Sequence, residues 1–120
     1  MDNTLQILLN KISDRTFQFW EYKVSHGSLL IRSPKNETHN TNIDLLLTGV
    51  EYISIPRTMK KIQISEPTII EQLEIEKILG KKINIASIFV ISSSNSKFLI
   101  VASSMRFDEN ELDIFESPFD

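Results

Sequence analysis

The stretch that most constrains the fold is residues 16–33, TFQFWEYKVSHGSLLIRS, the densest run of strand-forming residues in the first third of the chain. Apolar and polar residues alternate around Phe17 and Phe19, and the alternation resumes in the opposite phase at Trp20 and Tyr22. A period of two is typical of a β-strand with one buried face. The one-residue slip between Phe19 and Trp20 predicts a β-bulge, or a strand that passes from one sheet environment to another.

Turn chemistry follows at residues 25–28, and Leu29 and Ile31 then resume the apolar pattern. The His26-Gly27 step suits a tight connection, because glycine adopts positive φ without a steric cost. We therefore expect a β-hairpin over residues 16–33, in which His26 is a turn residue or a member of a polar network.

The composition is that of a globular domain. The 120 residues are 41% hydrophobic and 24% charged, which predicts a single domain over residues 1–120. The absence of cysteine excludes disulfides, thiolate nucleophiles and cysteine-ligated metals. Residues 1–15 begin with an acid and hold only a short, interrupted apolar run, so we expect no signal peptide, no membrane partner and a cytoplasmic location.

The charge is mildly acidic and unevenly placed. The formal net charge is −3, which argues against a nucleic-acid partner, since such binding depends on a basic footprint. The excess acid lies in residues 66–76 and 108–120. A basic partner surface is the natural complement to such segments.

Periodicity predicts two helices and several strands. In residues 4–12, Leu5, Leu8, Leu9 and Ile12 have the spacing of one helix face, which predicts a short N-terminal helix. Residues 42–55 alternate on either side of Gly49, which indicates two strands joined at that glycine.

The second half predicts one helix, one brief strand and one hairpin. Residues 62–64 form the brief strand, and the helix occupies about residues 67–79, with Ser65 or Glu66 as its cap and a broad apolar arc typical of a well-buried helix. Residues 83–92 and 97–103 predict a second hairpin. The fold class is therefore α+β: a mainly antiparallel β-sheet of about six to seven strands, a short N-terminal helix and one internal helix. For residues 105–120, a final strand, a short helix and an acidic partner-binding tail all stay open.

No constellation predicts catalysis. The two histidines, His26 and His39, lack the neighbouring ligands of a metal site, and the serines at 92–94 lack any nucleophile motif. The three glycines stand alone, so no phosphate-binding loop is present. We expect no catalytic residues, no metal and no cofactor, and hence no enzyme.

Two groups of residues are candidates for partner binding, and the first consists of Trp20, Tyr22, His26 and Arg32 of the hairpin. The phase slip prevents the side chains of Phe17, Phe19, Trp20 and Tyr22 from all lying on one face. We therefore expect Trp20 and Tyr22 to be partly exposed, and exposed aromatic residues are frequent hot spots of interfaces. The second group is the acidic C-terminal segment, whose large apolar residues a purely solvating tail would not need. Its candidate residues are Asp108, Glu109, Glu111, Asp113, Phe115 and Glu116.

The pattern W-E-Y-x-V-S-H-x-x-L-x-I-R from Trp20 to Arg32, followed by N-I-D-L-L-L-x-G-V-E-Y-I-S-I-P from Asn42 to Pro56, resembles small bacterial proteins of the immunity type found in polymorphic toxin systems. The features shared are the early tryptophan, the Ser25-His26 pair and the later apolar strand. The resemblance covers the first half of the chain. It implies neutralisation of a partner protein by binding, without catalysis.

Two functions follow as hypotheses. The first is a non-enzymatic protein-interaction module, in its specific form an immunity-like inhibitor, that binds a cationic, toxin-like protein. The alternative is a small-anion binding or minimal enzymatic module, with a pocket near the hairpin formed by Trp20, Tyr22, His26 and Arg32. Homo-oligomerisation through a free sheet edge or the C-terminal segment is compatible with either.

Overall fold

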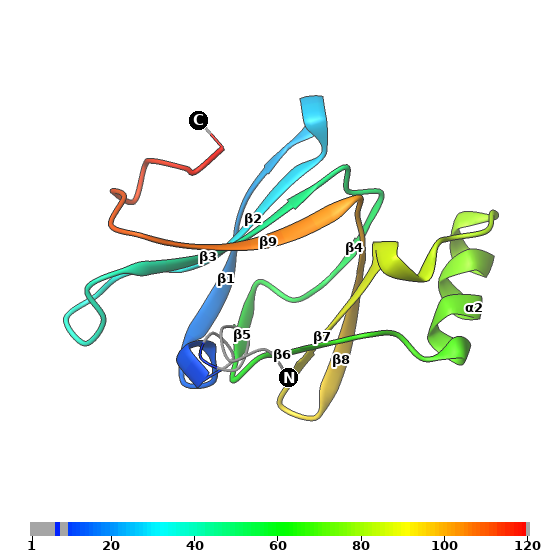
Figure 1. The fold of residues 1–120 in the computed structure, drawn as a ribbon, viewed down its shortest axis with the longest axis horizontal. Helices are drawn as coiled ribbons and strands as arrows, with labels where there is room; N and C mark the ends of the chain where they lie inside the picture. Colours follow the sequence, from blue (N-terminus) through cyan, green and yellow to red (C-terminus); the bar gives the residue numbers. More distant parts are fainter. Residues whose placement is uncertain (1–6, 8–9, 120) are drawn as a thin grey trace.

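The computed structural model describes residue 7 and residues 10–119, which form an α+β fold with nine strands in two antiparallel sheets (Figure 1). The predicted fold class is confirmed, with more strands than expected. The strands are β1 (Thr16–Lys23), β2 (Ser28–Ser33), β3 (Asn42–Thr48), β4 (Tyr52–Ser54), β5 (Thr58–Lys60), β6 (Gln63–Ser65), β7 (Ile88–Ser93), β8 (Ser96–Val101) and β9 (Ser104–Asn110). The helical elements are α2 (Ile69–Leu79) and two 3-10 helices, η1 (Val24–His26) and η2 (Ile85–Ser87).

The two sheets are separate, and the chain crosses between them several times. Sheet A has the order β5-β1-β2-β3-β9, and sheet B has the order β4-β8-β7-β6. The chain passes from one sheet to the other between β3 and β4, between β4 and β5, between β5 and β6, and between β8 and β9. Backbone hydrogen bonds from Glu51 N to Val101 O (2.8 Å) and from Ser103 N to Thr48 O (2.9 Å) link the segments at these corners. The apolar faces of both sheets therefore enclose one core.

That core is built from alternate residues of the strands, as the period of two requires. Leu29 and Ile31 of β2, Leu45 of β3, and Ile91 and Ile100 of sheet B are all fully buried in it. Burial of each such side chain contributes about 1.5 to 3 kcal/mol. Long-range packing between the two sheets thus dominates the stability of the fold.

The first hairpin forms with the predicted bulge. The register of β1 and β2 shifts between Phe19 and Glu21, so that Trp20 is the bulged residue. The connection is longer than the predicted His26-Gly27 step, because Lys23 pairs with Ser28 and η1 fills the gap. Gly27, at φ 58°, ends η1, and a Cβ there would lie 2.9 Å from the Val50 backbone nitrogen. Only glycine allows the hairpin tip to approach the β3–β4 corner so closely.

Two further predictions hold in outline and differ at their bounds. Residues 42–55 form β3 and β4 on either side of Gly49, as expected. The second hairpin consists of β7 and β8, but residues 85–87 adopt the 3-10 helix η2 and not a strand, because the Asn84 side chain caps that turn by accepting a hydrogen bond from Ala86 N at 2.9 Å. The strand β5 was not predicted.

In the N-terminal helix, Ile7 and residues 10–12 are helical and Ile12 is buried, whereas Leu5, Leu8 and Leu9 lie outside the described residues.

Helix α2 differs from its prediction in where it begins and in how much of it is buried. It begins at Ile69, two residues later than expected, because Thr68 is its N-cap and forms a capping box with Glu71. The helix covers the outer face of sheet B through Ile75, which packs with Ile83, Ile88 and Val101. It lies at the periphery of the molecule (Figure 1), and apart from Ile75 and the partly buried Leu79 its apolar side chains face solvent, so the prediction of a well-buried helix is wrong. The exposed fractions are 71% for Ile69, 69% for Ile70, 57% for Leu73 and 60% for Ile78.

Candidate functional site

The outer face of sheet A carries a buried ion pair. Arg32 on β2 lies opposite Asp44 on β3, and both side chains are 0% exposed. Arg32 Nε donates to Asp44 Oδ1 at 2.7 Å, and Nη2 donates to Oδ2 at 2.9 Å. A bidentate pair of this kind fixes both side chains. The guanidinium of Arg32 therefore holds Asp44 and reaches no solvent, and it is not available to a partner at the surface.

Trp20 and the end of β9 complete this polar cluster. The ring centroid of the bulged Trp20 lies 5.5 Å from the Arg32 guanidinium carbon, which is the geometry of a cation–π contact. From β9, Asn110 Nδ2 donates to Asp44 Oδ2 at 2.9 Å and to Asp108 Oδ2 at 2.6 Å. Trp20, Arg32 and Asp108 are thus brought together by the structure, and the contacts described for each are with its neighbours in this cluster.

Tyr22 and His26 lie apart from the cluster, toward the tip of the hairpin. Tyr22 is 37% exposed and pairs with Leu29, so it belongs to the opposite face of sheet A from Arg32. His26 is exposed in η1, and its carbonyl accepts a hydrogen bond from Gly49 N at 3.4 Å. The four residues suggested for a small-anion pocket therefore do not converge on one cavity.

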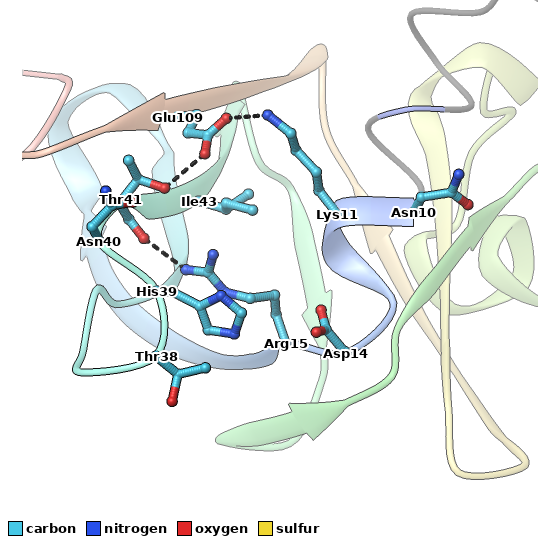
Figure 2. A pocket seen from close by; sticks show the side chains of 10 residues that line it. All are labelled: Asn10, Lys11, Asp14, Arg15, Thr38, His39, Asn40, Thr41, Ile43 and Glu109. Carbon is cyan, nitrogen blue, oxygen red and sulfur yellow. Dashed lines mark hydrogen bonds and ion pairs between the residues drawn. The ribbon is translucent and has the colours of Figure 1, made fainter.

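A polar cavity of about 340 Å³ lies where β9 approaches the N-terminal segment and the loop before β3 (Figure 2). Lys11 Nζ and Thr41 Oγ1 both point at the Glu109 carboxylate, at 2.8 and 2.7 Å. Arg15 is buried beside them and donates to the Thr41 carbonyl at 2.8 Å. The hydrogen bond from Lys11, and then that from Thr41, lower the pKa of Glu109.

The contacts around the cavity of Figure 2 hold neighbouring segments of the chain together. Arg15 also donates to Ser33 Oγ at 2.9 Å and to the Ser33 carbonyl at 3.0 Å, and its burial lowers the pKa of the guanidinium. His39 lines the wall, but the described residues hold no group of three or more histidine or acidic side chains that could bind a metal. Glu109 thus ties the N-terminal segment and the Thr41 loop to β9.

The C-terminal segment after β9 is fixed to the domain by its backbone. Lys35 Nζ donates to the Glu111 carbonyl at 2.6 Å, and Asn42 Nδ2 donates to the Leu112 carbonyl at 2.8 Å. Asn42 is itself 2% exposed, so the anchor lies within the fold. Of the described residues 105–119, the first six belong to the final strand β9, which ends at Asn110, and an irregular segment follows.

That segment contains a tight turn, residues 113–116, which we call the acidic turn. Glu116 N donates to the Asp113 carbonyl at 2.9 Å, while Asp113 N donates to Glu116 Oε1 at 2.9 Å. The Phe115 backbone N–H donates to Asp113 Oδ1 at 3.3 Å. This turn holds the Phe115 side chain 92% exposed between two exposed carboxylates, with Glu111 also exposed nearby in sequence.

The structure divides the predicted partner-binding residues into two sets. Trp20, Arg32, Asp108 and Glu109 make contacts within the domain, whereas six others present surface that a partner could reach. Those six are Tyr22, His26, Glu111, Asp113, Phe115 and Glu116. Sequence reasoning missed Asp44, the partner of Arg32, and the exposed side chains of α2. An alternating polar residue opposite an arginine is a signal for the former only when the strand register is known.

Comparisons with known proteins give no assignment: no family model, no curated protein and no solved structure matches this chain. Within the described part of the chain, no helix is long and apolar enough to cross a membrane. The site must therefore be interpreted from its own chemistry.

Proposed function

We propose that this chain is a non-enzymatic module that binds a cationic partner protein through the acidic turn. The observation that carries the proposal is the 92% exposure of Phe115 on a turn whose backbone is held by hydrogen bonds. A large aromatic side chain on a rigid support is a typical hot spot of an interface, because it loses little conformational entropy on binding.

The charges around Phe115 specify the partner. Glu111, Asp113 and Glu116 are exposed and surround the aromatic side chain in sequence. Lys11 is engaged by Glu109 on β9, and Lys35, whose ammonium donates to the Glu111 carbonyl, offsets one of these three negative charges. A partner with an apolar pocket rimmed by lysine or arginine would satisfy both features. Residues 20–56 resemble immunity proteins, so we propose a basic, toxin-like protein as the partner. The function would then be inhibition of that protein by binding.

Affinity capture from a lysate of the source organism tests the proposal. The full chain and the variant Phe115→Ser are immobilised, and Val24→Ser is the matched control, because Val24 is also apolar and 83% exposed but lies in η1. We expect the full chain and Val24→Ser to retain the same basic protein and Phe115→Ser to lose it. A cut at residue 105 is not a useful control, because it removes β9 and its pairing with β3.

Salt dependence tests the electrostatic part separately. Replacing Glu111 by glutamine removes one exposed charge without disturbing the hydrogen bonds of the acidic turn, which use Asp113 and Glu116. We expect Glu111→Gln to bind less tightly in low salt, and the difference to shrink as salt screens exposed charges. A captured protein with an acidic surface, or equal retention by Phe115→Ser, would remove the basis of the proposal.

A further inference from the structure

An apolar groove of about 480 Å³ lies beside β9, between sheet A and the start of β7. Its walls include Ile64, Phe89, Met105 and Phe107, which pack on the core and yet stay half-buried. Ile85 of η2 adds a side chain that is 45% exposed. A cavity of this size lined by apolar side chains has the character of a ligand site.

The second observation is a free sheet edge next to the groove. β9 is the last strand in the order of sheet A and pairs with β3 along all seven of its residues. No strand in the described chain pairs with its opposite edge. Alternate residues of a strand direct their N–H and C=O groups to opposite sides, so about half of the β9 backbone groups face that unpaired edge.

The groove lies next to the free edge of β9, on the interior side of sheet A. Met105 and Phe107 are two residues apart on β9 and pair with Leu47 and Leu45, whose side chains are in the core, so both face the interior side of sheet A. The other walls of the groove come from β6, β7 and η2, so the groove lies at the β9 edge. A strand added alongside β9 would place every second side chain over the groove.

Glu66 indicates which charge a segment bound in the groove should carry. It is exposed, lines the groove, and has no hydrogen bond or ion pair with any described residue. We propose that β9 and this groove bind an extended segment of a partner protein by strand addition, with apolar side chains at every second position in the groove and a basic side chain near Glu66. The site is separate from the acidic turn, and its occupation does not depend on Phe115.

The test uses synthetic peptides and the full chain. The probe is a fluorescently labelled eight-residue peptide in which leucine alternates with lysine, and the control has the same composition in two blocks. We expect fluorescence anisotropy to show binding of the alternating peptide at least about tenfold tighter than binding of the block peptide. No binding of the alternating peptide at millimolar concentration, or equal binding of the two, overturns the proposal.

Backbone methylation separates strand addition from simple apolar capture. In a strand, the leucine residues all direct their N–H groups to one side and the lysine residues direct theirs to the other. We therefore expect one of two peptides, methylated on the leucine or on the lysine nitrogens, to lose binding about tenfold while the other retains it. Equal binding of both methylated peptides would show that no β-pairing takes place.

Protein variants locate the site. Ala86→Phe places a larger side chain in the groove and should weaken peptide binding by about tenfold, whereas Thr58→Phe, at an exposed position of β5, should not. Phe115→Ser should also bind the peptide normally, so failure here and failure of the proposed function are distinguishable. Unchanged binding by Ala86→Phe overturns the proposal. Self-association that Ala86→Phe abolishes would assign the edge to a second copy and also overturn it.

Discussion

Replacement of Asp44 by alanine is expected to destabilise the fold by about 3 to 5 kcal/mol, because it leaves the Arg32 guanidinium buried and uncompensated. Both side chains are 0% exposed and are joined by hydrogen bonds of 2.7 and 2.9 Å. The substitution also removes an acceptor of Asn110 Nδ2 at 2.9 Å. The loss is a large part of the roughly 5 to 15 kcal/mol by which domains are stable, and corresponds to a fall in melting temperature on the order of 10 to 25 °C.

Urea unfolding at neutral pH, followed by circular dichroism, measures this loss. The matched control is the double variant Arg32→Met with Asp44→Leu, which replaces the pair by apolar side chains and should recover most of the stability. A loss of less than about 1 kcal/mol in Asp44→Ala, or a double variant as unstable as the single one, would refute the role assigned to the ion pair.

Three further outcomes are expected. The lowered pKa of Glu109 means that its stabilising contribution is present above the unfolded value of about 4.3 and is lost as pH falls through the folded value, so Glu109→Gln should flatten the acid side of a thermal-melt pH profile. Gly49→Ala should cost about 1 to 3 kcal/mol in urea unfolding, because Gly49 has φ +61° and an added Cβ would collide with Ser103; an unchanged midpoint would contradict this. On α2, Ile75→Ala should cost about 2 to 5 kcal/mol and the exposed Leu73→Ala no more than about 0.5, so equal costs would contradict the packing described.

Much of the fold could be predicted from local patterns in the sequence. The bulge at Trp20 could be predicted because the apolar alternation changes phase there, and one extra residue in the strand keeps Phe19 and Tyr22 on the same face. The turn at Gly49 could be predicted because glycine interrupted two apolar runs. Helix α2 was placed within two residues, but its exposed face was not, since the spacing of Ile69, Leu73 and Ile75 is the same whether a sheet covers that face or not.

The contacts of the site depended on strand register, which the sequence does not contain. Arg32 and Asp44 are paired only because β2 and β3 align in the register observed. The same holds for the acids of the C-terminal segment. Asp108 and Glu109 lie on β9 opposite Asp44 and Ile43 and are used within the domain, whereas Glu111 follows the end of β9 and stays exposed. The amino-acid composition of the C-terminal segment alone does not show which of its acids are used within the domain and which stay exposed.

The measurement that tests the central claim most directly is the dissociation constant of the captured partner for three forms of the chain: unmodified, Phe115→Ser and Val24→Ser. If Phe115 on the acidic turn is the anchor, Phe115→Ser should weaken binding by about 30-fold or more, the size of a hot-spot effect of about 2 kcal/mol, and Val24→Ser should leave it unchanged. Equal affinities for all three forms would contradict the role of Phe115 and place the interface elsewhere.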